Sequence, residues 1–157
     1  MGGGYQVAFM VPTEILAKQH FEKISPQLRE IRIALLTSSL KKYDKVKIHK
    51  EIKEGKIDLV IGTHSLIQEE LIFKNLGLVI IDEQHKFGVV QRGLLSKKGN
   101  NPDILIMTAT PIPRTLAITL YGDLDLSLIR EMPPGRPSIK TLFFAEEERT
   151  KGYSIAR

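Results

Sequence analysis

The chain of 157 residues contains no cysteine. Without thiols, neither a disulfide scaffold nor a metal site built on cysteine is possible. The spacing of the histidines is unlike that of zinc ligands, so we predict no structural metal. There are four of them: His20, His49, His64 and His85. With 42% hydrophobic and 26% charged residues, the composition is that of an ordinary globular domain large enough to bury a core.

The chain also lacks a long apolar run. Its longest runs, such as Leu78–Ile81, are far too short to cross a bilayer, and the N-terminus shows no signal-peptide pattern. We therefore expect a soluble, cytoplasmic protein with no membrane partner. The net charge of +5 favours a polyanionic partner such as nucleic acid, although an excess of this size is weak evidence by itself.

Short apolar runs alternate with amphipathic stretches along most of the chain. The runs are nearly continuous in Val, Ile, Leu, Phe and Met, which is typical of strands covered on both faces in a parallel sheet. We expect strands at Val7–Val11, Ile31–Leu36, Ile57–Ile61, Leu78–Ile81 and Ile104–Met107. We expect helices at Thr13–Ile24, Lys41–Glu54 and Pro113–Leu120. The repeated strand–helix–strand order predicts an α/β fold whose strands end at one shared edge, where ligands bind in such folds.

A cluster of prolines interrupts this pattern at Met132–Pro137. Three prolines and a glycine cannot continue a helix or a central strand, so we predict a linker or domain boundary there. After it, Ser138–Phe144 resembles one more strand, and the charged tail Ala145–Arg157 is a candidate helix.

The strongest chemical signal is the run LVIIDEQH at residues 78–85, in which an apolar strand leads into two carboxylates. One carboxylate of such a pair can hold Mg²⁺, usually through water, while the other polarises a water molecule that attacks a γ-phosphate. Asp82 and Glu83 are therefore the candidate catalytic pair, with Asp82 as the metal residue. For a bare Asp-Glu pair an exposed acidic turn is the commoner explanation, and the full run is what favours a site.

Polar groups also follow other expected strands. Thr108 and Thr110 follow one strand, Thr13 follows the first, and Thr63 with His64 follows a third. Such groups can bind the acidic pair or a phosphate, and a helix N-terminus at Thr13 suits a backbone phosphate. Helix capping explains the threonines 13 and 110 equally well, and a lone histidine is more often structural. Repetition at four strand ends favours a ligand-binding edge.

Taken together, these runs resemble superfamily 2 helicases and, within them, the RecG branch-migration helicases. The motifs that carry the resemblance are PTEILAKQH (12–20), LLTSS (35–39), GTHSLIQ (62–68), DEQH (82–85) and TATPIPRTLA (108–117). Residues 120–136 are similar to the RecG junction between two motor domains. The transcription-repair coupling translocases share PIPRT but tend to have DEEH, so Gln84 favours RecG. Ser38 is a departure, because the family more often has Gly there.

The resemblance implies an incomplete RecA-like (P-loop NTPase) domain of an ATP-dependent DNA helicase that remodels branched DNA. In that family pattern Asp82 organises Mg²⁺ and Glu83 is the general base. Contacts with DNA, mostly with phosphates, are implied for Thr13, Ser38, Ser39, Thr63 and His64.

Coupling roles follow from the same resemblance. Gln84 and His85 would link the nucleotide state to the DNA side, and Thr108 and Thr110 would couple hydrolysis to movement. Two alternatives stay open: a transcription-repair coupling translocase, and a non-catalytic nucleic-acid-binding relative. The intact Asp-Glu pair speaks against the second, because a binding protein has no need of both carboxylates.

The sequence contains no phosphate loop of the form GxxxxGK[ST]. The Gly55-Lys56 pair is followed by Ile57 and fails the pattern. In the family the loop lies upstream of Val7–Val11, so we expect it to precede Met1. The full-length protein would use Mg²⁺ and ATP, whereas the 157-residue chain alone is expected to bind neither tightly and to be inactive.

We expect three segments: 1–132 as the first motor domain without its phosphate-loop part, 133–137 as a linker, and 138–157 as the start of a second motor domain. Apolar surface left uncovered by the missing part would favour self-association.

Overall fold

The computed structural model of the protein describes residues 4–83, 94–109, 125, 127–129, 131, 135 and 141–155. The chain divides into two compact units, Met1–Ile112 and Pro113–Arg157. The boundaries predicted from the sequence, at 132 and 138, remain a prediction. The described elements of the first unit are β1 (Gln6–Met10), α1 (Glu14–Ile24), β2 (Ile33–Leu36), α2 (Lys42–Lys53), β3 (Leu59–Gly62), η1 (His64–Ile67), β4 (Leu76–Ile81) and β5 (Asp103–Ile106).

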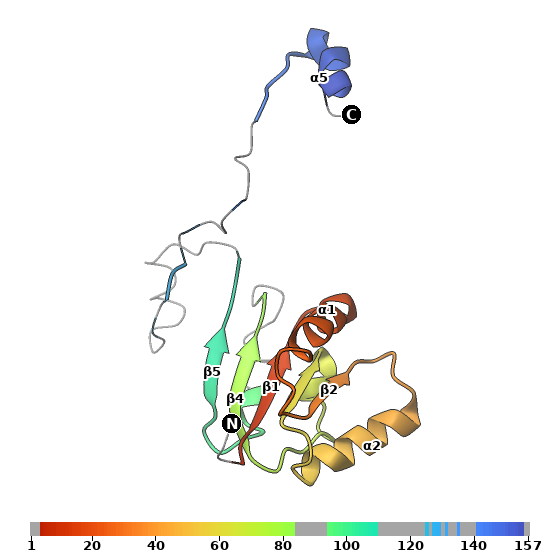
Figure 1. Cartoon of the computed structure of the whole chain (residues 1–157), viewed down its shortest axis with the longest axis vertical. Coiled ribbons are helices and arrows are strands. Elements are labelled where there is room, and N and C mark those ends of the chain that lie inside the picture. Colours follow the sequence, from red (N-terminus) through yellow and green to blue (C-terminus); the bar gives the residue numbers. More distant parts are fainter. Residues whose placement is uncertain are drawn as a thin grey trace. The chain divides into compact units, whose positions relative to one another are not determined.

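These strands form one sheet in the order β2-β3-β1-β4-β5, and each pairing is parallel (Figure 1). The predicted α/β fold with a parallel sheet is confirmed. The five strands expected between Val7 and Met107 are each present within a residue or two of their expected bounds. The expected helix at Pro113–Leu120 lies outside the described residues.

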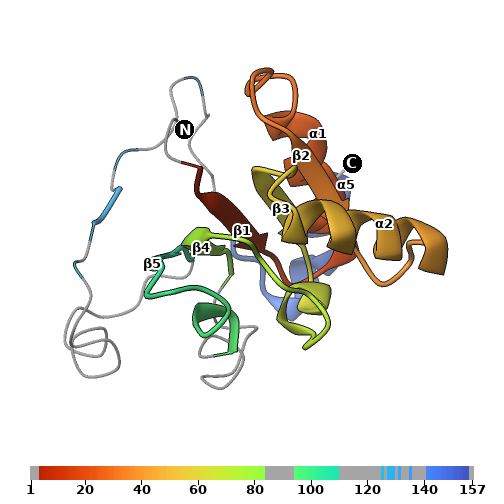
Figure 2. The ribbon, with the colours of Figure 1, turned by 90° about the horizontal axis from the view of Figure 1, so that it is seen from below.

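Both faces of the sheet are covered around β1, which explains why its sequence is apolar throughout. Val7 and Phe9 pack on one face with Ala17 of α1, whereas Ala8 and Met10 pack on the other with α2 and η1. Figure 2, which looks along the strands, shows α1 and α2 on opposite sides of the sheet. The core therefore consists of two apolar layers separated by the sheet.

The outer strand of this order, β5, is less well covered. Ile104 and Leu105 are 40% and 47% exposed, although the strand is apolar in sequence. These two side chains are exposed apolar surface at an outer strand of the sheet.

Local sequence signals set the helix ends. The side chain of Thr13 caps α1 by accepting a hydrogen bond from the N–H of Leu16 at 3.3 Å. Helix α2 ends at Lys53, two residues before Gly55, whose φ of +74° suits glycine. Both ends lie within one residue of the predicted positions.

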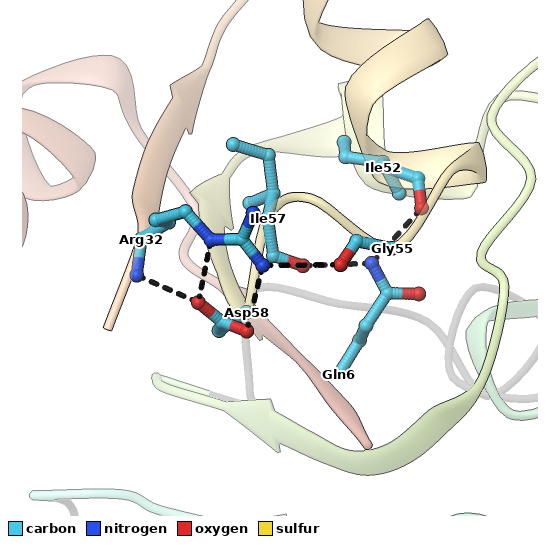
Figure 3. Close-up of polar contacts among 6 residues, drawn as sticks. All are labelled: Gln6, Arg32, Ile52, Gly55, Ile57 and Asp58. Carbon is cyan, nitrogen blue, oxygen red and sulfur yellow. Dashed lines mark hydrogen bonds and ion pairs between the residues drawn. The ribbon is translucent and has the colours of Figure 1, made fainter. Parts of the chain in front are cut away.

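A polar network ties the N-terminal edge of the sheet together (Figure 3). The side-chain amide of Gln6 donates to the carbonyls of Ile52 and Ile57 at 2.9 and 2.7 Å. Its oxygen accepts from the N–H groups of Lys74 and Asn75 at 2.8 and 3.1 Å. Gln6 is only 2% exposed, so this edge is closed by a fully hydrogen-bonded buried side chain.

Beside this network, Arg32 and Asp58 form an ion pair across the starts of β2 and β3 (Figure 3). The guanidinium of Arg32 lies 3.2 Å from the Asp58 carboxylate and also donates to the carbonyl of Gly55 at 3.2 Å. The N–H of Arg32 donates to the same carboxylate at 2.7 Å. The pair fixes the distance between two neighbouring strands.

In the second unit the described residues form η3 (Glu146–Glu148) and α5 (Arg149–Ile155), so the helix predicted in the charged tail is confirmed. The predicted strand at Ser138–Phe144 is wrong for its described part, because Thr141–Phe144 is irregular. An apolar segment becomes a strand only where a neighbour pairs with its backbone, and none of the described strands pairs with this one. No helix in the described residues is long and apolar enough for a membrane crossing.

Candidate functional site

All described candidate residues lie at the C-terminal edge of the sheet, opposite the Gln6 network. Parallel strands end at the same edge, and each segment that follows a strand here carries a candidate. Thr13 follows β1, Ser38 and Ser39 follow β2, Thr63 and His64 follow β3, Asp82 and Glu83 follow β4, and Thr108 follows β5. Gln84, His85 and Thr110 lie outside the described residues.

Asp82 is held at this edge by both its backbone and its side chain. Its N–H donates to the carbonyl of Met10 on the neighbouring β1 at 3.0 Å. Its Oδ1 accepts from the N–H of Glu83 at 2.9 Å, and its Oδ2 lies 3.1 Å from Nε2 of His20 on α1. A carboxylate can only accept, so Nε2–H is the donor in this contact. The carboxylate is thus oriented by one donor on each oxygen.

His20 is a site residue that the sequence analysis missed. Its ring packs on Phe9 of β1 with 4.8 Å between ring centroids and a tilt of 48°. The side chains of His20 and Asp82 are 27% and 20% exposed, so the contact is largely shielded from water. The spacing of Ala17, His20 and Ile24 places them on one helical face, and that spacing was the signal available in the sequence.

Glu83 adopts a backbone conformation that is unusual for a glutamate. Its φ is +52°, in the left-handed region, which costs a residue with a side chain about 1 kcal/mol or more. The hydrogen bond from its N–H to Asp82 stabilises this turn. Strain of this kind persists where the surroundings fix it, and it is often found at functional sites.

Thr108 lies at the end of the strand that neighbours β4. Ile81 of β4 is paired with Ile106 of β5, and the N–H of Met107 donates to the carbonyl of Ile81 at 2.8 Å. This register brings Thr108 to the same edge as the two carboxylates. A contact of the Thr108 hydroxyl with the acidic pair stays a prediction.

The loop after β2 is bound to the start of α1 through Glu14. The carboxylate of Glu14 accepts from the hydroxyl of Ser38 and, at 3.0 Å, from the N–H of Ser39. The Ser38 hydroxyl and then Ser39 lower the pKa of Glu14 to about 2. Lys45 donates to the carbonyl of Ser38 at 2.7 Å. Glu14 is a second residue that sequence reasoning treated only as part of a helix start.

Thr13, Thr63 and His64 differ in their availability. Thr13 is exposed but its hydroxyl caps α1, whereas Thr63 is only 6% exposed and its carbonyl accepts from Leu66 at the start of η1. His64 is exposed. Helix capping by Thr13 is therefore present in the molecule, and a capping hydroxyl can still contact a ligand.

The donor set can be compared with the needs of a metal ion. Within the described residues, no three His, Asp or Glu side chains gather into a cage. Mg²⁺ does not need one, because it keeps several waters and binds through one or two carboxylates and the substrate phosphates. The oriented and partly exposed Asp82 carboxylate fits that mode. The site suits a hydrated Mg²⁺ shared with a nucleotide.

The sequence of the chain is similar to that of known helicases. The sequence profile of the DEAD/DEAH box helicases matches residues 1–118. The chain is 54% identical over 154 residues to the ATP-dependent DNA helicase RecG of Aquifex aeolicus, covering 96% of this chain and 19% of that protein. It is 56% identical over 145 residues to RecG of Streptococcus pneumoniae, covering 92% and 22%. The chain thus spans about a fifth of the length of these curated relatives.

Solved structures give the same picture. The chain is similar to RecG bound to a three-way DNA junction, with 47% identity, a TM-score of 0.81, and coverage of 98% of this chain and 21% of that one. A likeness to the Mycobacterium smegmatis helicase Lhr, at 19% identity and a TM-score of 0.53 over 72% of this chain and 16% of the other, concerns the fold alone.

Proposed function

The chain belongs to the DEAD/DEAH box helicase family and has its RecA-like fold, and on this premise we propose that it forms the nucleotide- and DNA-facing edge of a RecG-type, ATP-driven DNA motor. Identity of about half over nearly the whole chain supports RecG over a transcription-repair coupling translocase. An ATP-dependent helicase needs both carboxylates of Asp82 and Glu83, whereas a non-catalytic binding relative does not. Cytoplasmic location is part of the proposal.

One observation carries the proposal. Asp82 and Glu83 leave β4 at the same edge at which β1, β2, β3 and β5 present their hydroxyl, imidazole and backbone groups. A motor must bring nucleotide and nucleic acid to one rigid framework, and the ends of adjacent parallel strands provide it.

On the nucleotide side, Asp82 would hold Mg²⁺ through water and Glu83 would act as general base on the attacking water. Bound Mg²⁺ neutralises charge on the phosphates during phosphoryl transfer. Glu83 directly follows Asp82, and its left-handed backbone with a φ of +52° supports a fixed turn at this point. Thr108, together with Thr110, Gln84 and His85, would couple hydrolysis to movement.

On the nucleic-acid side, Ser38 and Ser39 are the exposed hydroxyls of the loop after β2, with Lys45 beside them. Contacts of hydroxyl, amide and lysine groups with phosphates position DNA without reading its sequence, which suits a translocating motor. Thr13, Thr63 and His64 would extend this line of contacts. The similar RecG structure is bound to a three-way junction, which supports branched DNA as the substrate.

The 157-residue chain alone carries no phosphate loop, so we propose that it neither binds ATP tightly nor hydrolyses it. Isothermal titration with Mg·ATP should give no micromolar binding. Micromolar affinity in that titration would contradict the proposal.

The proposal has two further parts. Residues 133–137 form an interdomain linker, and the chain self-associates through the exposed β5.

A chimaera tests the catalytic assignment. Residues 5–155 would replace the matching segment of Aquifex aeolicus RecG, to which the chain is 54% identical. We expect DNA-stimulated ATP hydrolysis in the chimaera. Glu83→Gln should keep Mg·ATP binding and lower the turnover by at least about 100-fold, because a general base is lost.

The matched control is Glu22→Gln, on the exposed side of α1, which should leave turnover unchanged. Retained DNA-stimulated hydrolysis in the Glu83 variant would remove Glu83 from the role of base. A chimaera that folds but never responds to DNA would argue against the motor assignment as a whole.

A further inference from the structure

We propose that His20 is a positioning residue for Asp82: its imidazole holds the carboxylate in the orientation in which it receives hydrated Mg²⁺. The inference rests on the proposed function, because it takes Asp82 as the metal residue. It adds helix α1 to the nucleotide side of the site, a role that none of the motif assignments above gives to His20.

The contacts around the Asp82 carboxylate carry the inference. Oδ2 accepts from His20 at 3.1 Å and Oδ1 accepts from the N–H of Glu83 at 2.9 Å. The terminal torsion of an aspartate is soft when nothing restrains it. Two donors on different oxygens fix the plane of the group, and each oxygen keeps a second lone pair for a metal-bound water.

His20 is itself held in place by the core. Its ring packs on Phe9, which is 5% exposed, and its helix is fixed to the sheet by Ala17, which is fully buried. A donor whose own orientation is set by packing pre-organises the ligand that it contacts. The low exposure of the pair, 27% and 20%, strengthens the hydrogen bond relative to one in water.

A simpler explanation is that His20 merely fills space against Phe9. The two explanations differ in the part of the side chain that matters. Glutamine can place an amide N–H near the position of Nε2 but has no ring, whereas phenylalanine keeps the ring and has no donor. His20→Gln and His20→Phe therefore separate positioning from packing.

The experiment uses the 157-residue chain labelled with ¹⁵N, with Mg²⁺ alone as the probe. The amide signal of Glu83, whose N–H donates to Asp82, reports on the carboxylate during a Mg²⁺ titration at constant ionic strength and constant pH. Mg²⁺ prefers oxygen ligands, so direct binding to the imidazole does not confuse the result. Gln19→Ala, at the exposed neighbouring position, is the matched control.

We expect His20→Ala and His20→Phe to raise the dissociation constant for Mg²⁺ roughly 10-fold, as loss of a partner behind a metal-binding carboxylate does. His20→Gln and Gln19→Ala should stay close to the unmodified chain. Thermal unfolding should follow the opposite order, with the Phe variant more stable than the Gln variant, because packing on Phe9 governs stability.

Mg²⁺ affinity of the Phe variant equal to that of the unmodified chain would overturn the inference, and so would a Gln variant as weak as the Ala variant. If His20→Ala does not fold, the comparison of Gln with Phe decides alone. The chain alone lacks the nucleotide phosphates that complete the site, so the titration extends to Mg²⁺ concentrations that saturate a weak site. If Glu83 does not respond even there in the unmodified chain, the metal role of Asp82 fails and the inference fails with it. A response that is equal in every variant removes only the role of His20.

Discussion

Both edges of the sheet carry polar side chains, and the two edges differ in how far these side chains are buried and hydrogen-bonded within the protein. At the N-terminal edge, the Gln6 amide makes hydrogen bonds with four backbone groups and Asp58 is paired with Arg32 (Figure 3). At the C-terminal edge, Ser38 and Ser39 are exposed, and Glu83 holds a strained backbone. Gln6 at the first edge is buried and its side-chain amide is fully hydrogen-bonded within the protein, whereas Ser38 and Ser39 at the second edge are exposed.

With the proposed function, this difference would place stability and function at opposite ends of the same strands. A buried and fully bonded side chain stabilises the sheet but has nothing left to offer a substrate. Groups that meet a substrate must keep free lone pairs and stay near water, so they contribute less to folding. Substitutions at the two edges should therefore have separable effects.

The largest effect should come from Gln6→Leu. The substitution removes the side-chain partner of the Ile57 carbonyl and of the N–H groups of Lys74 and Asn75. The Ile52 carbonyl loses one donor but keeps the N–H of Gly55 at 3.0 Å. Unpaired buried groups cost about 1–3 kcal/mol each, and water can reach some of these, so we expect a loss of roughly 3 kcal/mol in the free energy of unfolding. Urea unfolding of the 157-residue chain measures it. A loss below about 0.5 kcal/mol, the range typical of surface substitutions, would break the comparison.

A smaller effect should appear when acid removes the Arg32–Asp58 pair. Burial raises the pKa of Asp58, but the hydrogen bonds and charge of Arg32 outweigh it and lower the pKa below the ordinary 3.8. Because the folded-state pKa is the lower one, this stability is fully present above pH 3.8 and is lost as the pH falls through the folded pKa. Urea midpoints from pH 5 downward should fall less steeply in Asp58→Asn than in the unmodified chain.

The smallest effect on stability should follow Ser38→Ala at the functional edge. The Ser38 hydroxyl is the largest cause of the lowered pKa of Glu14, about 2, so its removal should raise that pKa toward 4.5. Carboxyl ¹³C shifts followed against pH measure the change. A folded-state pKa below the unfolded one contributes stability at neutral pH, so its rise should lower the urea midpoint there. The loss should stay well below that of Gln6→Leu, because solvent weakens an interaction at the exposed Ser38. A destabilisation as large as that of Gln6→Leu would show that the two edges are not separable.

Much of the fold was predictable, and the reason is physical. A strand that is buried on both faces, such as β1, must be apolar at each position, and that pattern survives in the sequence. The position of Asp82 at the C-terminal edge of the sheet then follows from parallel pairing alone. The strand expected around Thr141–Phe144 failed because its apolar residues carry no information about a pairing partner.

The contacts within the site were harder to predict. His20 and Asp82 are 62 residues apart, and only the packing of α1 on the sheet brings them together. Glu14 is a common residue in the first turn of a helix, so the sequence gives no separate signal for its hydrogen bonds to Ser38 and Ser39. Local patterns predicted the elements and the edge, whereas side-chain partners from different elements depend on the three-dimensional arrangement.

Helix α1 makes two of the contacts described above, six residues apart. Glu14 in its first turn binds the loop after β2, and His20 contacts the carboxylate at the end of β4. Six residues of helix measure about 9 Å, and backbone this short does not bend appreciably. A displacement of Asp82 must therefore either carry the serine loop with it or break one of these hydrogen bonds. The stiffness of α1 therefore couples the position of the loop after β2 to the position of Asp82 at the end of β4.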